Sequence, residues 1–198
     1  MINLKSAVEF TGDEEKQIDE FVAAHPEMSG TELWTNAPKN IKHKINEFYT
    51  KQQNARCVYC ECLLKPGDDP VEHLAAKSKY REYVFEPCNL SVSCTSCNSP
   101  TIKGKRETVI KSDISSAYSA QRFSIVHPHF DDPKVHIFFI DDDEVHVDQT
   151  RCTKKGWETV KFFEWNELWA IPVLESIKLS KSCDKNIAEL IERIITYK

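Results

Sequence analysis

The sequence predicts an α+β protein with a small β-rich centre between two helical parts. Three observations support this fold class. Apolar residues recur at helical spacing near the N-terminus and again in the last third of the chain. Short β-prone runs separated by Asn, Ser, Pro and Gly fill the middle. Two Cys-x-x-Cys pairs lie in that middle part, as in small structures that a zinc ion stabilises.

The first predicted helix covers residues 12–25, where acidic side chains come first and apolar ones follow at helical spacing. Thr11 or Asp13 would cap its start, because both side chains can accept a hydrogen bond from the first turn. Pro26 and Gly30 would end it.

A second helix is expected over residues 38–52, which place apolar side chains on one face. Residues 1–52 would then form a helical lead-in. Residues 53–111 hold both cysteine pairs and form the expected functional core. Residues 112–198 would pack with that core as one unit, because a chain of 198 residues is short enough to share one hydrophobic core.

The C-terminal extension is expected to contain a β-hairpin and two helices. The β-prone runs 135–140 and 144–147 lie on either side of an acidic turn, which is typical of a hairpin. Residues 165–179 and 184–197 have apolar side chains at i, i+3 and i+4 spacing, which predicts helices.

The cysteine pairs predict a structural zinc site. Cys57 and Cys60 form the first pair, and Cys94 and Cys97 form the second. Two thiolates from each of two tight turns supply the four tetrahedral ligands of a closed Zn²⁺ site. A thiol redox protein is disfavoured, because it would need one reactive pair beside a βαβ pattern.

The remaining cysteines have no evident partners, and we expect them to be small buried residues. They are Cys62, Cys88, Cys152 and Cys183. Cys62 is close enough to the first pair to compete as a zinc ligand. A disulfide scaffold is not expected, because the chain is long and starts without the pattern of a secretion signal.

Composition restricts the kinds of partner. No run of about eighteen apolar residues is present, which argues against a membrane span, and we expect a cytoplasmic protein. The formal net charge is −5, so any contact with nucleic acid must be local. Two clusters of basic side chains are candidates for such a contact: Lys77, Lys79 and Arg81, and then Lys103, Lys105, Arg106 and Lys111.

Glu72 and His73, between the cysteine pairs, have the chemistry that phosphodiester hydrolysis needs. Imidazole can take a proton from water near neutral pH, and a carboxylate can bind a hard cation such as Mg²⁺. A strand over residues 71–74 would present His73. Because consecutive strand residues point to opposite faces, the strand must end or twist here if both side chains serve one site. Asn89 and Asn98 follow, and they count only as members of this set.

These motifs together resemble the HNH endonucleases, which have a ββα-metal finger, also called a His-Me finger. The closest resemblance is to a bacterial branch that reads roughly C-x-Y-C-E, then E-H-x-x-P-K-S, then N-L-x-x-S-C-x-x-C-N-S. The corresponding stretches here are 57–61, 72–78 and 89–99. That branch includes HNH subunits of anti-phage systems such as the Septu type, which act beside an ABC or SMC-like ATPase. The resemblance implies such a partner, and a nucleic-acid substrate that is DNA in preference to RNA.

The resemblance also implies a role for each site residue. His73 would be the general base, Asn89 would brace the loop, and Glu72 and Asn98 would hold the catalytic Mg²⁺ or Mn²⁺. Two positions depart from the pattern: Ala76 replaces a proline, and an insert of four residues lengthens the connection before Lys103. The insert puts a phosphate contact by Lys103 in question.

Alternatives remain for several features. The whole chain could be a non-catalytic zinc module that binds nucleic acid or a protein partner. The stretch His127–Pro133, HPHFDDP, could hold a second metal ion or contact substrate, but a turn fixed by Asp and Pro is favoured. Five aromatic side chains could stack on bases, but core packing is favoured; they are Trp157, Phe162, Phe163, Trp165 and Trp169.

Overall fold

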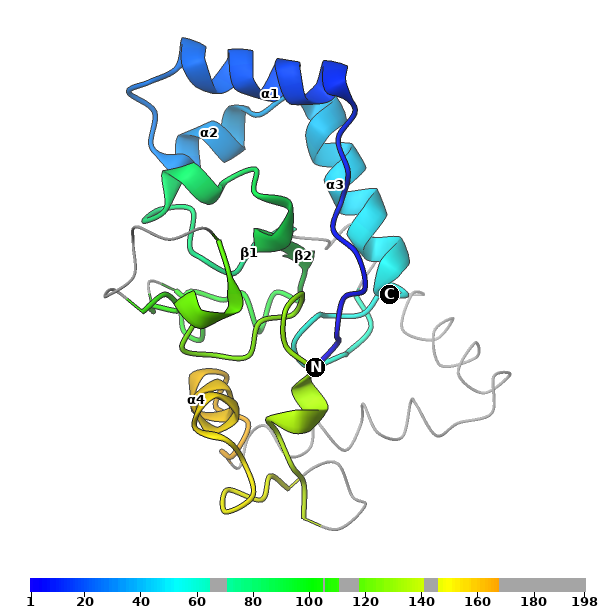
Figure 1. Ribbon diagram of the computed structural model, residues 1–198, viewed down its shortest axis with the longest axis vertical. Helices are drawn as coiled ribbons and strands as arrows, with labels where there is room; N and C mark the ends of the chain where they lie inside the picture. Colours follow the sequence, from blue (N-terminus) through cyan, green and yellow to red (C-terminus); the bar gives the residue numbers. More distant parts are fainter. Residues whose placement is uncertain (65–70, 105, 111–117, 141–145, 168–198) are drawn as a thin grey trace.

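The described part of the computed structural model comprises residues 1–64, 71–104, 106–110, 118–140 and 146–167. It begins with three helices, α1 (Gly12–Ala24), α2 (Gly30–Asn36) and α3 (Lys39–Gln52). A sheet of two short strands, β1 (Val71–His73) and β2 (Leu90–Val92), follows, and α4 (Lys154–Phe162) comes last. Figure 1 shows α1 and α2 at one end of the molecule, the sheet in the middle and α4 at the other end. The α+β class is therefore confirmed.

Helix α1 confirms the first predicted helix and its cap. The Thr11 hydroxyl accepts a hydrogen bond from the backbone N–H of Glu14 at 3.3 Å, and the Glu14 carboxylate accepts one from the Thr11 N–H at 2.8 Å. This reciprocal pair satisfies two backbone donors at the helix start. Ile18 is the buried residue of α1.

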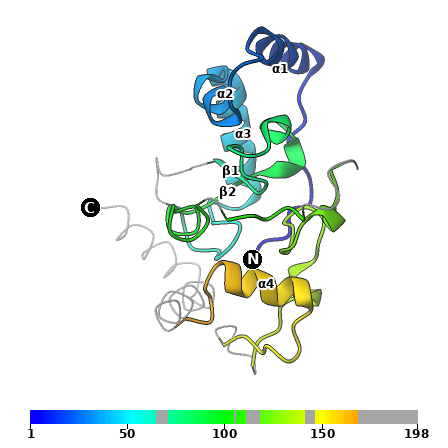
Figure 2. The same ribbon diagram turned by 90° about the vertical axis from the view of Figure 1, so that its left-hand side faces the viewer.

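Helix α2 was not predicted, because Gly30 was expected only to end the preceding helix. Gly30 instead begins α2, after a second capping box in which Ser29 and Glu32 exchange the same two hydrogen bonds. The glycine is needed for packing: a Cβ at this position would collide with the carbonyl oxygen of Lys77. Because α2 packs so closely on that carbonyl, it lies over the segment that follows β1 (Figure 2).

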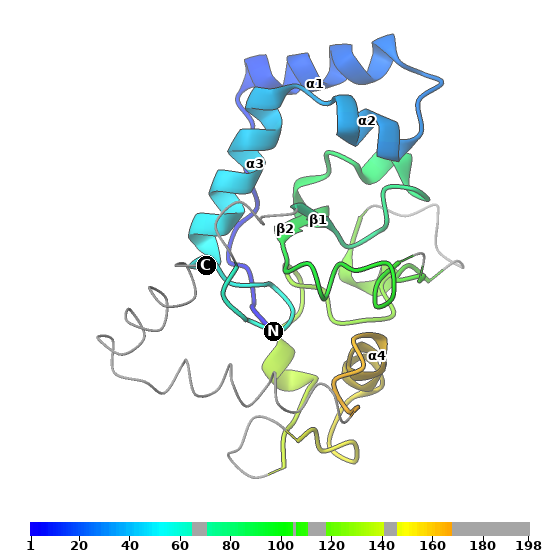
Figure 3. The ribbon, with the colours of Figure 1, turned by 180° about the vertical axis from the view of Figure 1, so that it is seen from behind.

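Helix α3 confirms the second predicted helix and supports the sheet. Its buried face comprises Ile41, Ile45 and Tyr49, and the helix packs against β2 (Figure 3). Just past the helix end, the Gln53 side chain binds both polar backbone groups of Val92, with Nε2 donating to the carbonyl at 2.8 Å and Oε1 accepting from the N–H at 2.9 Å. The edge of the short strand is thereby satisfied.

The sheet is antiparallel, with Val71 opposite Val92, Glu72 opposite Ser91 and His73 opposite Leu90. The predicted strand near His73 is thus confirmed, and it ends at that residue. Two 3₁₀ turns lie between the strands, η1 (Arg81–Tyr83) and η2 (Pro87–Asn89). After β2 the chain from residue 95 to 104 follows successive turns, in which the Lys103 N–H donates to the Ser99 carbonyl at 3.0 Å.

The predicted hairpin in the extension is only partly correct. Phe139 and Val147 form a single antiparallel bridge, whereas Val135 belongs to a 3₁₀ turn, η5 (Pro133–Val135). Proline fixes φ at a value suited to a turn, and the Asp132 carboxylate accepts a hydrogen bond from the Lys134 N–H at 3.0 Å. These two features explain why the first run does not begin as a strand. Residue 144 and the connecting turn lie outside the described residues.

The last part of the described chain contains one further turn and helix α4. Another 3₁₀ turn, η4 (Ala120–Arg122), precedes it, and the Thr153 hydroxyl caps α4 by accepting from the Gly156 N–H at 3.1 Å. Of the helix predicted over 165–179, residues 165–167 are not helical, and the rest of it, like the helix predicted over 184–197, lies outside the described residues. No helix in the described part of the chain is long and apolar enough to cross a membrane.

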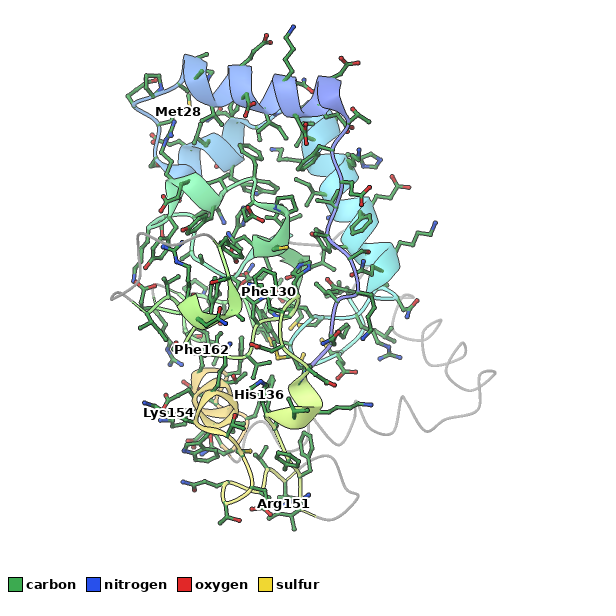
Figure 4. All side chains as sticks on the ribbon, in the orientation of Figure 1. Met28, Phe130, His136, Arg151, Lys154 and Phe162 are labelled. Carbon is green, nitrogen blue, oxygen red and sulfur yellow. The ribbon has the colours of Figure 1, made fainter. Side chains whose placement is uncertain are left out.

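One cluster of buried apolar residues links the parts of the chain. It includes Ile41 and Ile45 from the N-terminal helices, Leu90 and Val92 from the sheet and Val160 from α4. Figure 4 shows side chains filling the space between these elements, with Met28 at the loop between α1 and α2 and Lys154 at the other end of the molecule. The sheet that carries Glu72 and His73 is therefore covered from several sides.

Candidate functional site

The four predicted zinc ligands lie together. The Sγ atoms of Cys57, Cys60, Cys94 and Cys97 are all within 4.8 Å of one another, and those of Cys60 and Cys94 are 3.8 Å apart. Four thiols at this spacing, drawn from two turns, match the donor set of a closed tetrahedral zinc site. The cluster could therefore hold one Zn²⁺.

Backbone geometry shapes both cysteine turns. In the first, the Glu61 N–H donates to the Cys57 carbonyl at 2.9 Å, and Glu61 adopts a positive φ of 62°. In the second, the Cys97 N–H donates to the Cys94 sulfur at 3.4 Å. A backbone N–H aimed at sulfur favours the thiolate form, which is the form that binds metal.

The other described cysteines, Cys62, Cys88 and Cys152, are half-buried, whereas buried side chains were expected. Burial raises the pKa of the Cys57 thiol, but the neighbouring thiols, chiefly those of Cys60 and Cys62, outweigh burial and hold this pKa well below its usual range. The Cys62 thiol is thus a direct neighbour of the cluster, although the group of four does not include it. The Cys152 sulfur accepts a hydrogen bond from the Phe138 N–H at 3.4 Å, and Cys183 lies outside the described residues.

Glu72 is a buried carboxylate, only 1% exposed. Its Oε1 accepts a hydrogen bond from the Tyr59 hydroxyl at 2.8 Å and forms an ion pair with the Lys103 ammonium. Burial, with the Glu72 charge, raises the pKa of Tyr59 well above its usual value, so this hydroxyl stays protonated and donates. The carboxylate is therefore compensated by one neutral donor and one positive charge.

His73 is buried on the other face of β1, with 2% of its surface exposed. Its Nε2 lies 3.1 Å from the Val84 carbonyl oxygen, which can only accept, so Nε2 carries the hydrogen. Among the described residues, Nδ1 has no hydrogen-bond partner. The edge-to-face ring of Trp34 in α2 covers the imidazole, with 4.7 Å between ring centroids.

The protonation state of His73 follows from this burial. Burial lowers the pKa of His73 well below its usual value, and the positive charges of Lys77 and Lys103 lower it further. The imidazole is therefore neutral at pH 7, with the lone pair on Nδ1.

Asn89 holds the loop after β1 in place. Its Oδ1 accepts from the Ala75 N–H at 2.7 Å and from the Tyr118 hydroxyl at 2.9 Å. Its Nδ2 donates to the carbonyl oxygens of Tyr83 at 2.8 Å and of Ala75 at 3.2 Å. All four hydrogen-bonding positions of the side chain are thus used.

Asn98 differs sharply from Asn89. It is half-buried directly after Cys97, and its side chain makes no hydrogen bond to any described residue. Its backbone N–H donates to the Cys94 carbonyl at 3.1 Å, which keeps it in the second cysteine turn. Zinc ligation would therefore set the position of Asn98.

Three of the proposed contacts to nucleic acid form ion pairs with acidic residues of the chain, Lys103 in the interior and Lys79 and Arg106 at the surface. Lys103 is 5% exposed and points at Glu72 instead of the surface, because a buried carboxylate needs a charged partner. Lys79 pairs with Glu107 at 3.1 Å, and Arg106 pairs with Glu164 at 2.7 Å. Lys77 is half-buried, and burial lowers its pKa; Lys105 lies outside the described residues.

The stretch from His127 to Pro133 forms a turn, which is the structure that the sequence analysis favoured over a second metal site. The Asp131 carboxylate accepts from the His127 N–H at 2.7 Å. His127 Nδ1 accepts from the His129 N–H at 3.2 Å, and His129 Nε2 donates to the Leu90 carbonyl at 2.9 Å. The ring of Phe130, near the middle of Figure 4, stacks on that of His127 with 4.3 Å between centroids.

This turn also reaches the candidate site. His127 Nε2 lies 3.1 Å from the Tyr118 oxygen, and the Tyr118 hydroxyl in turn donates to Asn89. Sequence reasoning missed Tyr118, Trp34 and Tyr59, because their contacts join segments that are far apart along the chain. Tyr59 alone carried a local signal, since it lies inside the first cysteine turn.

The aromatic residues of the extension pack in the core as favoured. Phe163 and Trp165 are 1% and 8% exposed, and the Tyr59 and Phe163 rings lie 4.2 Å apart. Trp169 lies outside the described residues.

Comparison with known proteins gives one informative match. No family model matches the chain. The chain is 30% identical over 142 residues to the Septu protein PtuB of Bacillus thuringiensis. The matched region covers 69% of this chain and 46% of that protein, so the chain spans about half the length of the curated relative that it matches.

Proposed function

We propose that this protein is a metal-dependent HNH-type endonuclease that hydrolyses phosphodiester bonds of nucleic acid, DNA in preference to RNA, in bacterial anti-phage defence. The similarity to a Septu protein supports the defence role. Strand β1 supplies a candidate general base, His73, and a candidate metal ligand, Glu72, on opposite faces. Together these two independent observations favour a nuclease over a zinc module of purely structural use.

One observation carries the enzymatic part of the proposal. His73 is a neutral, buried imidazole whose Nδ1 has no partner among the described residues, although buried polar atoms are normally hydrogen-bonded. The Val84 carbonyl fixes the tautomer by accepting from Nε2. An imidazole held in this way has an unpartnered basic nitrogen, which can act as a general base once water reaches it.

Two of the predicted site residues carry oxygen atoms of the kind that a hard divalent ion binds. Glu72 offers a carboxylate and Asn98 a side-chain carbonyl that no described residue uses. Oxygen donors of this kind bind Mg²⁺ or Mn²⁺, in contrast to the four thiols, which suit Zn²⁺. When bound, such an ion would stabilise negative charge on the phosphoryl and leaving oxygens.

Each of the other site residues would then have a separate role in the reaction. His73 would accept a proton from water at Nδ1, while the Val84 carbonyl would stabilise the imidazolium through Nε2–H. Asn89 would keep the loop between the strands in register through its hydrogen bonds to Ala75 and Tyr83. The zinc cluster would hold Asn98 in position, because Asn98 directly follows Cys97.

A nuclease assay with a matched control tests this proposal. Zinc-loaded protein is incubated with plasmid, single-stranded DNA and RNA in Mg²⁺ or Mn²⁺. Wild type should cleave, His73→Ala should lose at least about a hundredfold in rate, and His43→Ala, at a ring that is 81% exposed, should match wild type. Equal rates for wild type and His73→Ala would contradict the enzymatic proposal.

We further propose that an ABC or SMC-like ATPase acts with this protein. The acidic net charge of −5 and the surface ion pairs that Lys79 and Arg106 form with glutamates favour delivery of substrate by another subunit. Co-expression with a neighbouring ATPase gene, followed by co-purification and a phage plaque assay, tests this partnership. Loss of protection in the His73→Ala strain would tie defence to the same site.

The closed state of the site favours a second candidate function. His73 is 2% exposed and Lys103 is paired with Glu72, as expected of a non-catalytic zinc module that binds nucleic acid or a protein partner. Such a module would bind one Zn²⁺, would show no second metal site, and would keep its partner binding in His73→Ala. The assays above separate the two functions.

A further inference from the structure

The Glu72 carboxylate already has a cation beside it. The Lys103 ammonium forms an ion pair with Glu72 Oε1 and donates a hydrogen bond to the carbonyl oxygen of His73. The side chains of Lys103 and Glu72 are 6% and 1% exposed. A carboxylate oxygen and a carbonyl oxygen therefore converge on one positive charge that is shielded from solvent.

These oxygens are also the kind that a divalent metal ion selects. A bound ammonium and a bound Mg²⁺ or Mn²⁺ would repel each other strongly across a buried carboxylate, because charges interact far more strongly in the interior than in water. We infer that Lys103 is a built-in competitor of the metal ion, so that the site accepts the ion only when the ammonium leaves Glu72. The inference rests on the proposed function, which names Glu72 as a metal ligand.

Tyr59 provides the contrast that makes this inference specific. Its hydroxyl donates to the same Glu72 oxygen at 2.8 Å but carries no charge. A neutral donor can turn aside or remain on a second lone pair, whereas an ammonium opposes a second cation. Competition should therefore depend on the Lys103 charge and not on the number of hydrogen bonds that Glu72 receives.

Nucleic acid is the partner that would release Lys103. A phosphate group is a strong acceptor for a lysine ammonium, and Lys103 lies in the turn that starts at Ser99, close after Asn98 along the chain. Transfer of the ammonium from Glu72 to phosphate would leave the carboxylate for the metal ion. Substrate and metal binding would then favour each other.

Metal binding tests the inference directly. The affinity of the full-length, zinc-loaded protein for Mn²⁺ is measured by electron paramagnetic resonance for wild type, Lys103→Met, Lys79→Met and Tyr59→Phe. We expect Lys103→Met to bind Mn²⁺ at least about tenfold more tightly than wild type. Lys79→Met makes the same change at a lysine paired with Glu107, and it should stay within about threefold of wild type, as should Tyr59→Phe.

Thermal melting shows whether the variants are folded. Lys103→Met leaves the buried Glu72 side chain without its positive partner, so this variant should melt at a lower temperature than wild type. Mn²⁺ should then raise its melting temperature more than it raises that of wild type. Glu72→Gln combined with Lys103→Met removes both charges; it should bind no Mn²⁺ at the levels that saturate Lys103→Met.

The effect of DNA on Mn²⁺ affinity is measured in His73→Ala, because under the proposed function this variant does not cleave the DNA. A short DNA duplex should tighten Mn²⁺ binding to His73→Ala by at least about threefold and should have no such effect on His73→Ala combined with Lys103→Met. Equal tightening in both proteins would overturn the release of Lys103 by phosphate.

The outcomes separate this inference from the proposed function. If wild type cleaves nucleic acid but Lys103→Met binds Mn²⁺ no more tightly than Lys79→Met, Lys103 is not a competitor although the nuclease proposal stands. If Lys103→Met gains Mn²⁺ affinity while no variant cleaves any substrate, the competition is upheld and the nuclease proposal is overturned. Weaker Mn²⁺ binding by a folded Lys103→Met would also overturn the inference.

Discussion

Glu72 and His73 are consecutive residues of β1, and their side chains serve opposite faces of the two-stranded sheet. Glu72 contacts Tyr59 and Lys103, whereas His73 contacts the Val84 carbonyl and the Trp34 ring. This alternation is the ordinary consequence of strand geometry. A substitution that touches only one face should therefore change the side-chain contacts of that face first, whereas Lys103 pairs with Glu72 and also lowers the pKa of His73, so it links the two.

The Trp34 ring should protect His73 from chemical modification. Diethyl pyrocarbonate reacts with an unprotonated imidazole nitrogen, and in wild type the covered Nδ1 should react slowly. Trp34→Ala should speed modification of His73 by at least about tenfold, as read by mass spectrometry of the modified peptide, because it removes the cover. The exposed ring of His43 is the internal reference.

Trp157→Ala is the matched control for this experiment. Trp157 is also half-buried, but it belongs to α4, at the other end of the molecule from α2 (Figure 2). Its loss should leave the reactivity of His73 unchanged. Rapid modification of His73 in wild type would show that the imidazole is open in solution, against the burial described above.

Zinc binding should depend on four cysteines and not on their neighbours. Wild type should retain one Zn²⁺ per chain after gel filtration, and Cys97→Ser should lose it together with several kcal/mol of stability, since metal binding is coupled to folding. Cys152→Ser should retain the ion. Metal analysis and thermal melting measure both effects.

Cys62→Ser tests whether the nearby thiol is a ligand. Cys62 contacts Cys57 and Cys60 but is not part of the group of four, so this variant should retain one Zn²⁺. Loss of zinc from Cys62→Ser, with retention by Cys60→Ser, would assign the fourth ligand to Cys62.

Local patterns predicted the features that local physics determines. The spacing of Cys57, Cys60, Cys94 and Cys97 predicted the thiol cluster, because a gap of two residues allows the two sulfurs of each pair to lie in one turn. The acidic first turn and the Thr11 cap foretold α1. The capping box of Ser29 and Glu32 was equally visible in the sequence, but a helix of seven residues has too weak an apolar periodicity to be recognised.

Long-range contacts could not be predicted in the same way. Lys103 was a candidate for contact with nucleic acid, with that contact in question, and nothing in its neighbourhood along the chain shows that it pairs with Glu72, thirty-one residues earlier. The cover of Trp34 on His73 likewise joins the helical lead-in to the sheet. Such contacts depend on how the elements pack, and periodicity carries no information on that.

Substitution of Asn89 and substitution of Asn98 should have very different effects on the free energy of unfolding. Asn89→Ala removes four hydrogen bonds and leaves the buried Ala75 N–H without a partner, so it should cost about 3 kcal/mol of unfolding free energy. Asn98→Ala removes no hydrogen bond to a described residue and should cost less than about 0.5 kcal/mol. Urea denaturation of the zinc-loaded proteins measures both.

Nucleic-acid cleavage by Asn89→Ala and Asn98→Ala is compared next. Under the proposed function both variants should lose cleavage, Asn89→Ala through a displaced loop and Asn98→Ala through a missing metal ligand. Extra Mn²⁺ should restore part of the activity of Asn98→Ala and none of that of Asn89→Ala. An Asn98→Ala variant as unstable as Asn89→Ala would show that Asn98 is a structural residue.

The pH dependence of stability should report on His127. Burial, with His129 and Lys155 nearby, lowers the pKa of His127 to about 2, from an ordinary value of 6.5. Between these two values the unfolded chain binds a proton that the folded protein does not, so stability is complete above pH 6.5 and falls as the pH drops below it. The slope for one proton is about 1.4 kcal/mol per pH unit.

Substitution of His127 should therefore flatten the pH profile. Between pH 6.5 and pH 5, wild type should lose about 2 kcal/mol more unfolding free energy than His127→Gln, with zinc in excess so that the cysteine cluster contributes equally to both proteins. His43→Gln, at an exposed ring, is the matched control and should keep the wild-type profile. A wild-type profile as flat as that of His127→Gln would mean that the His127 ring can take up a proton without unfolding, and hence that its contacts with Tyr118 and His129 open readily in solution.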